Sequence, residues 1–189
     1  MVRRAFAPLL LSLVHEEQQL LVWLVNDTPD PVSGTIRLTL FDFDGTPLHS
    51  KNVSAAAPPN SSVLAATKPL QELGFLDATR HFIYARMPDK GRTVVETAFL
   101  LARFREVKFS RTRVAWEVRK VGQQTFEVEM RSKAFAKAVC LETKAAVDYS
   151  DNFVDLVPSA RKSIVITTRR DIDLEEFKSG LKVSNGIFS

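Results

Sequence analysis

The sequence predicts an all-β protein of two tandem immunoglobulin-like β-sandwich domains with minor short helices. Short apolar runs of strand length recur along the chain, and Gly, Pro, Asn and Asp separate them roughly every 8 to 12 residues. About seven such runs fall within roughly the first hundred residues, which is the count expected of one immunoglobulin-like sandwich. With 189 residues, of which 45% are hydrophobic, the chain is long enough to form two cores. We therefore expect one sandwich over residues 1–105 and a second over residues 106–189.

The strands of the first domain alternate with recognisable turns. Residues 9–14 and 19–25 flank the polar sequence HEEQ, which predicts a hairpin, and the second run is apolar on both faces, as in a central strand. The dipeptide Asp44-Gly45 predicts a tight turn between the next two strands. The other predicted features of this domain are strands at 35–43, 46–53, 61–67, 81–87 and 93–102, a loop at 26–34, a single helical turn at 69–73 and a turn at 88–91.

The second domain shows the same alternation of strands and turns. Its predicted strands are 114–118, 125–130, 139–141, 163–168 and 181–185. We interpret the Ala-rich stretch 133–138 as an irregular crossover, because it is short and runs directly into strand sequence. Residues 171–179 predict a short helix with Asp171 as its N-cap and Gly180 as its stop.

Residues 148–158, with the sequence DYSDNFVDLVP, predict a corner between two sheets of the second domain. Turn-forming residues stand next to a short apolar run, and a strand follows. Ser, Asp and Asn can satisfy local backbone groups with their own side chains. Pro158 prevents further strand pairing because it has no N–H to donate.

Charge and hydropathy exclude several classes of partner. The net charge is +4, and Lys and Arg exceed Asp and Glu by only one in residues 1–105 and three in 106–189, so we expect no nucleic-acid partner. No apolar run approaches the ~18 residues of a membrane span. Pro8 interrupts the first apolar run and no cleavage site follows, so we expect a strand there and no signal peptide. The single Cys140 excludes an intrachain disulfide and fits a reducing compartment.

No catalytic or metal-binding pattern is evident in the sequence. His15, His49 and His81 lie in or beside separate turns without metal-ligand spacing, and no phosphate loop or nucleophile elbow is present, so we expect no metal and no cofactor. A retaining glycosidase needs two carboxylates about 5 to 5.5 Å apart. Glu127 and Glu129 share a strand face but alternate with core residues, which indicates a solvated face.

Aromatic side chains are the remaining candidates for binding. Trp23 and Trp116 both lie in apolar strand sequence, which favours core positions. A tyrosine near a sheet corner often ties the turn to a nearby backbone group, and Tyr149 is placed to do so. Five residues are retained as candidates for ligand or interdomain contact: Trp116, Tyr149, Asp151, Asn152 and Phe153.

The corner and the segment before it also carry a family resemblance. The sequences AFAKAVCL (134–141) and SDNFVDLVP (150–158) resemble the C-terminal immunoglobulin-like domain of bacterial β-mannosidases of glycoside hydrolase family 2. Those enzymes have a Ser-Asp-Asn-aromatic-aromatic-Asp-Leu-Leu-Pro corner. This chain has Val154 for the second aromatic, Val157 for the second leucine and Ser159 for a usual glycine. The sequences FAPLLLSL (6–13) and LLVWLVNDT (20–28) resemble the opening of the preceding domain in the same enzymes.

The resemblance implies a non-catalytic part of a larger enzyme. In family 2 both catalytic glutamates lie on a TIM barrel, one within an Asn-Glu pair, and this chain has no Asn-Glu dipeptide. The chain itself is then expected to be inactive, and its partner is the barrel of the same parent chain, for which it forms a scaffold. The parent is expected to be a retaining enzyme of the bacterial cytoplasm that removes terminal β-D-mannose from non-reducing ends. The opening sequence MVRRAFAPLL then indicates a piece of a longer protein.

Two other functions stay open at this level. One is a stand-alone carbohydrate-binding module, whose ligand is a mannose-containing oligosaccharide stacked on exposed aromatic side chains. The other is a protein-interaction β-sandwich, which needs an exposed apolar patch or edge strand.

Overall fold

The computed structural model describes residues 7–74, 77–89, 93–158 and 160–187. Over these residues the chain consists mainly of antiparallel strands, with one α-helix and two 3₁₀ turns, which confirms the predicted all-β class. The chain separates into two compact units, one ending at Phe109 and the other beginning at Ser110. Part of the predicted turn at 88–91, the first six residues and Ser159 lie outside the described residues.

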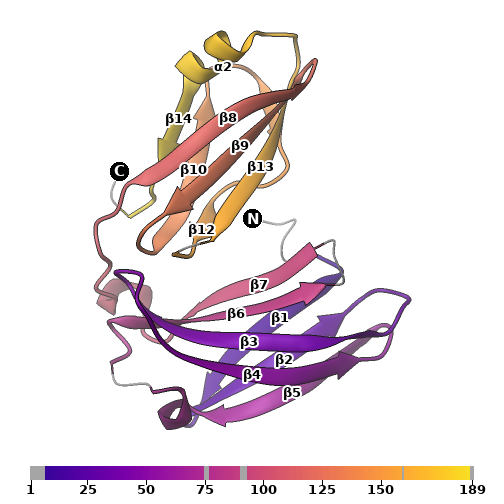
Figure 1. The fold of residues 1–189 in the computed structure, drawn as a ribbon, viewed down its shortest axis with the longest axis vertical. Helices are drawn as coiled ribbons and strands as arrows, with labels where there is room; N and C mark the ends of the chain where they lie inside the picture. The colour runs from indigo at the N-terminus through magenta and orange to yellow at the C-terminus, as the bar shows by residue number, and fades with distance from the viewer. Residues whose placement is uncertain (1–6, 75–76, 90–92, 159, 188–189) are drawn as a thin grey trace. The chain divides into compact units, whose positions relative to one another are not determined.

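The N-terminal unit is a sandwich of two antiparallel sheets, with strand orders β1–β2–β5 and β4–β3–β6–β7 (Figure 1). Its strands are β1 (Leu9–Glu16), β2 (Gln19–Asn26), β3 (Val32–Asp42), β4 (Pro47–Ala57), β5 (Ser61–Pro69), β6 (His81–Asp89) and β7 (Thr93–Leu100). The 3₁₀ turns η1 (Leu70–Leu73) and η2 (Phe104–Glu106) follow β5 and β7. The predicted helical turn therefore exists, and Gly74 ends it with a left-handed φ of 73°.

The core of this unit lies between its two sheets. On β2, the side chains of Leu20, Val22 and Leu24 are fully buried, whereas Trp23 points to the other face of the sheet and is half-buried. The prediction of a core position for Trp23 is therefore wrong. The strand is apolar on both faces, but only one of them packs against the second sheet of the unit.

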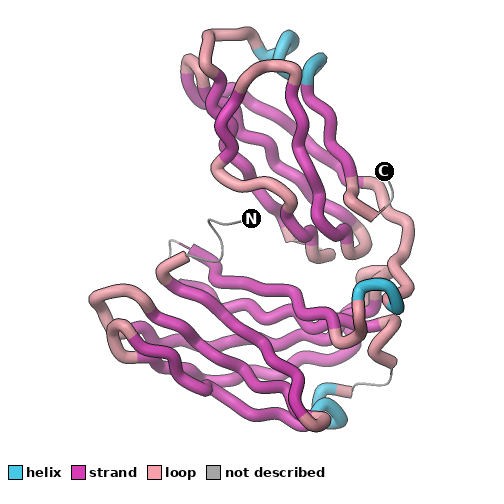
Figure 2. Tube along the Cα trace, turned by 180° about the vertical axis from the view of Figure 1, so that it is seen from behind, coloured by secondary structure: helices cyan, strands magenta, loops and turns pink. Residues whose placement is uncertain are grey.

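The C-terminal unit is a second sandwich, with strand orders β11–β13–β9–β8 and β12–β10–β14. Figure 2 shows both units from behind, with the helix at one end of this sandwich. The elements are β8 (Val114–Gly122), β9 (Thr125–Ser132), β10 (Ala136–Thr143), β11 (Val147–Tyr149), β12 (Val154–Leu156), β13 (Arg161–Thr168), α2 (Leu174–Gly180) and β14 (Leu181–Ser184). Fully buried residues such as Phe126, Val128 and Ile164 fill the space between the sheets.

Two predictions for this unit need correction. The N-cap of the helix is Asp173 and not Asp171, because Asp173 Oδ1 accepts the N–H of Glu176 at 2.7 Å. Residues 133–135 are irregular as predicted, but the last three residues of that stretch belong to β10. Its pairing with β12 shifts between Ala136 and Val139, which is a β-bulge.

Candidate functional site

The chain passes between the two sheets of the C-terminal unit at the predicted corner. β11 ends at Tyr149 in the four-stranded sheet, and β12 begins at Val154 in the three-stranded sheet. Ser150 fixes the first turn, since its N–H donates to the Val165 carbonyl at 2.8 Å and its Oγ accepts the N–H of Val165 at 2.9 Å. The residues between the strands therefore cross from one layer to the other.

At this crossing the side-chain amide of Asn152 bonds to the backbone of Leu141, as the backbone of a paired strand would. Its Nδ2 donates to the Leu141 carbonyl and its Oδ1 accepts the Leu141 N–H, both at 2.9 Å. Asp151 accepts the N–H of Asn152 at 2.9 Å. A buried backbone group without a partner costs about 1–3 kcal/mol, so these bonds stabilise the corner. Both side chains are used within the fold.

Asp155 holds the bulge of β10 in the same way. One carboxylate oxygen lies 2.6 Å from Lys137 Nζ, and the other accepts the N–H of Ala138 at 3.0 Å. Ala138 has a left-handed φ of 50°, which is uncommon for a residue other than glycine. The motif residues that carry the family resemblance therefore join β10 to β12.

Tyr149 also bonds within the fold. Its hydroxyl lies 3.3 Å from Thr143 Oγ1, and Thr143 Oγ1 donates to the Ala145 carbonyl at 2.9 Å. Because the single hydroxyl proton of Thr143 is used in that bond, the Tyr149 hydroxyl donates to Thr143. The tyrosine thus ties the corner to β10 through a threonine side chain, where a backbone group was expected.

Phe153 is the aromatic corner residue that faces solvent. It has a left-handed φ of 56°, and 52% of its surface is exposed. For a bulky side chain this backbone region costs roughly 1–2 kcal/mol. The bonds made by Asn152 on one side and Asp155 on the other hold Phe153 in this conformation.

Trp116 lies apart from the corner. β8 and β11 are opposite edges of one sheet, so Trp116 and Tyr149 are three interstrand spacings, about 14 Å, apart across the sheet. They are also four residues apart along the strands. Trp116 pairs with the buried Met130 on the core face of the sheet, yet it is 37% exposed. The prediction of a core position is wrong because β8 is the edge of a four-stranded sheet that packs against only three strands. The structure therefore does not unite the five candidates in one site.

The carboxylates on β9 form ion pairs with arginines. Arg119 Nη2 lies 2.9 Å from Glu127, and Arg161 Nη1 lies 2.9 Å from Glu129. The hydrogen bond from Arg119, followed by one from Ser163, lowers the pKa of Glu127. A glycosidase acid needs a raised pKa, so this pair fits the predicted solvated face.

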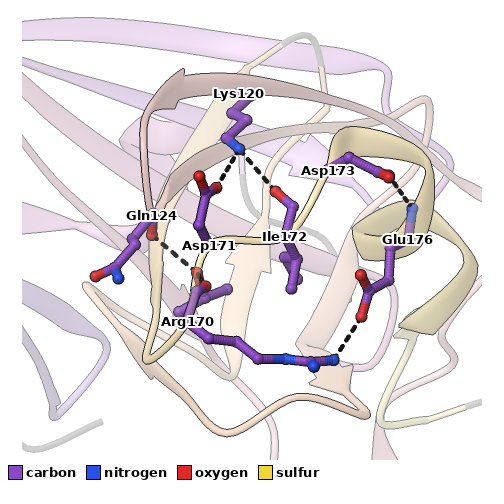
Figure 3. A network of polar contacts seen from close by, with 8 residues as sticks. Lys120, Gln124, Arg170, Asp171, Ile172, Asp173 and Glu176 are labelled. Carbon is purple, nitrogen blue, oxygen red and sulfur yellow. Dashed lines mark hydrogen bonds and ion pairs between the residues drawn. The ribbon is translucent and has the colours of Figure 1, made fainter.

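A polar network that the sequence did not reveal holds α2 against the sheet (Figure 3). Lys120 Nζ donates to Asp171 Oδ1 at 2.6 Å and to the Ile172 carbonyl at 2.7 Å, and Arg170 Nη2 lies 2.6 Å from Glu176. A small hollow of about 150 Å³ lies between α2 and residues 143–145. The Asp173-x-x-Glu176 pattern is a sequence signal for the start of the helix. Lys120 and Asp171 are 51 residues apart, so no local pattern could have predicted their contact.

Burial raises the pKa values of two side chains, Tyr84 and Cys140. Burial, and then the hydrogen bond that the hydroxyl donates to Glu96, raises the pKa of Tyr84. Burial, and then the nearby Glu142, raises the pKa of Cys140, which favours the protonated thiol. In the part of the chain that the structure describes, no three His, Cys, Asp or Glu residues are grouped to hold a metal ion. No helix within these ranges is long and apolar enough to span a membrane.

Fold and contacts together define a tandem of immunoglobulin-like sandwiches, and comparison with known proteins gives its family. Residues 18–106 match a family model described as a mannosidase Ig/CBM-like domain, and residues 105–186 match one described as an Ig-fold domain and named for mannosidases. These matches extend over nearly the whole chain. The chain therefore belongs to the family of immunoglobulin-like mannosidase domains, as its sequence resemblance indicated.

Solved structures show the same arrangement of strands. The β-D-mannosidase from Dictyoglomus thermophilum matches with a TM-score of 0.87 and 25% identity, over 98% of this chain and 22% of its own. The exo-chitosanase CsxA of Amycolatopsis orientalis matches with a TM-score of 0.65 and 15% identity, over 97% of this chain and 26% of its own, which shows the fold alone. The chain thus spans about a fifth to a quarter of these proteins. No curated protein matches the sequence.

Proposed function

We propose that the chain is the non-catalytic C-terminal part of a family 2 exo-glycosidase of the β-mannosidase type, and that it is a scaffold for the catalytic barrel. The observation that carries the proposal is the likeness to the Dictyoglomus thermophilum β-D-mannosidase, which extends over 98% of the chain with a TM-score of 0.87. In this proposal the parent enzyme removes terminal β-D-mannose from non-reducing ends. The lone Cys140 supports a reducing location, the bacterial cytoplasm.

The side-chain contacts support a structural role. The carboxylates of Glu127 and Glu129 are each paired with an arginine, and Asn152 and Asp155 bond to β10. A hydrolase acting alone needs a carboxylate pair flanking a sugar. These groups stabilise the fold instead.

The test measures hydrolysis and sugar binding by the 189-residue chain. We expect no hydrolysis of p-nitrophenyl β-D-mannopyranoside and no calorimetric signal with millimolar mannobiose or longer β-manno-oligosaccharides. In the longer enzyme, which is the proposed parent enzyme with its catalytic barrel, deletion of the residues that correspond to Leu9 and all that follow should lower the melting temperature of the catalytic domain. Hydrolysis by the chain alone, or an unchanged melting temperature after the deletion, would refute the proposal.

A carbohydrate-binding module is the second candidate, favoured by the exposed indole of Trp116. Pyranose rings stack on exposed tryptophan side chains. The family model described as CBM-like matches residues 18–106 and does not include Trp116. Saturable binding of a β-manno-oligosaccharide that disappears in Trp116→Ala would support this function over the scaffold.

A further inference from the structure

Three of the four cross-strand rows on the outer face of the β1–β2–β5 sheet carry no charged side chain. The fourth row, next to the β1–β2 turn, is Glu16, Gln19 and Pro69. Nine positions form the other three rows. Six are apolar, and serine or threonine occupies the rest, in a chain of which 25% is charged. We call the six the apolar face: Leu10, Val14, Leu21, Trp23, Val25 and Leu64.

Another outer sheet face of the protein shows the ordinary pattern. On the β11–β13–β9–β8 sheet, arginines and glutamates alternate, as in the pairs Arg119–Glu127 and Arg161–Glu129. An antiparallel sheet with one solvated face normally has polar residues there. The apolar face is therefore a local feature of one sheet and not a general property of the chain.

The apolar face has the anatomy of a protein–protein interface. Trp23 occupies the middle of the three uncharged rows, between Ser12 on β1 and Leu64 on β5. Its side chain is half-buried, and Leu64 is 42% exposed. Interface centres are depleted of charge and enriched in tryptophan, which anchors the partner. Leu64 is exposed and the other five residues of the apolar face are partly exposed. A continuous apolar surface of this kind on a folded domain marks such a contact.

We propose that the apolar face docks onto the catalytic domain that precedes it in the parent enzyme, an inference that rests on the proposed function. This chain covers only 22% of the Dictyoglomus β-D-mannosidase, so a relative of this kind has further domains to contact. A preceding domain joins the sandwich through Pro8, whose carbonyl accepts the N–H of Asp27 at 2.7 Å. The next strand, β1, is an edge strand of this same sheet. The covalent link therefore holds the preceding domain near this sheet at high effective concentration.

The first experiment is hydroxyl-radical footprinting of the two tryptophans, in the 189-residue chain and in the longer enzyme. We expect Trp23 to be oxidised in the chain and protected in the enzyme. Trp116 belongs to the other unit, so its oxidation in the isolated chain measures the radical dose against which the oxidation of Trp23 is compared. Equal oxidation of Trp23 in both proteins, with the enzyme active, would overturn the docking and leave the proposed function standing. Protection that appears in the 189-residue chain as its concentration rises would assign the face to a second copy and also overturn the docking.

The second experiment uses two leucines of similar exposure. Leu64 on the apolar face is 42% exposed, and Leu48 on β4 is 47% exposed. In the 189-residue chain, Leu64→Glu and Leu48→Glu should have the same melting temperature, because both side chains reach solvent. In the longer enzyme, Leu64→Glu should melt several degrees lower than Leu48→Glu, since it places an unpaired carboxylate in a contact.

The outcomes separate the two proposals. Identical melting temperatures of the two variants in an active longer enzyme would refute the docking alone. A longer enzyme without glycosidase activity would refute the proposed function, and the docking with it.

Discussion

Replacement of Asn152 by alanine removes the two side-chain hydrogen bonds that hold the corner to β10. Both bonds go to the backbone of Leu141 at 2.9 Å. Each contributes about 0.5–1.5 kcal/mol, and a backbone group left unpaired adds to the loss. We expect the free energy of unfolding of the C-terminal unit to fall by about 2–4 kcal/mol. A domain of this size has roughly 4–12 kcal/mol in total, so the melting temperature should fall by at least about 10 °C.

Urea unfolding followed by the fluorescence of Trp116, together with hydrogen exchange at the Leu141 amide, measures the effect. Asn152→Asp keeps the acceptor for the Leu141 N–H but places a second carboxylate oxygen against the Leu141 carbonyl, so it should also lose stability. Asn52→Ala is the control, because Asn52 is exposed on β4, and it should change stability by less than about 0.5 kcal/mol. An Asn152→Ala variant within that same margin of the wild type, with unchanged exchange at Leu141, would refute the assignment.

Three further predictions concern the N-terminal unit. Asn26 is fully buried and its amide lies near three backbone carbonyls, so Asn26→Ala should cost about 2–4 kcal/mol in urea unfolding; a loss below about 1 kcal/mol would contradict this role. The β1–β2 turn has left-handed φ values at Glu17 (44°) and Gln18 (68°). The double variant Glu17→Asn, Gln18→Gly should therefore raise stability by about 1 kcal/mol, and an unchanged melting temperature would argue against strain there. Burial and Glu96 raise the pKa of Tyr84 above its ordinary value of 10.0, so the folded state holds this proton more tightly. Its stabilising contribution should be complete below pH 10 and decline as pH rises further, and an absorbance titration in which Tyr84 ionises normally would contradict this.

The sequence was sufficient to predict most of the strands, the corner and the family, but not the short strand β11 (Val147–Tyr149). Strand positions follow from local alternation and turn residues, which act over a few neighbouring positions. The Asp44-Gly45 turn is such a case, and Asp42 Oδ1 accepts the Gly45 N–H at 2.8 Å. The corner was predictable because Ser150 and Asn152 are residue types that bond backbone groups, although the identity of their partners was not.

Tertiary structure alone decided which apolar positions are core and which distant residues meet. Trp116 follows the alternation of its strand, but the position of β8 at a sheet edge leaves it partly exposed. Asp171 has the sequence features of a helix cap, yet it bonds to Lys120, 51 residues away. Trp23 lies in a strand that is apolar on both faces, and only the packing of the second sheet determines which face is covered. Local patterns give the periodicity of burial, whereas the burial itself depends on what lies opposite in space.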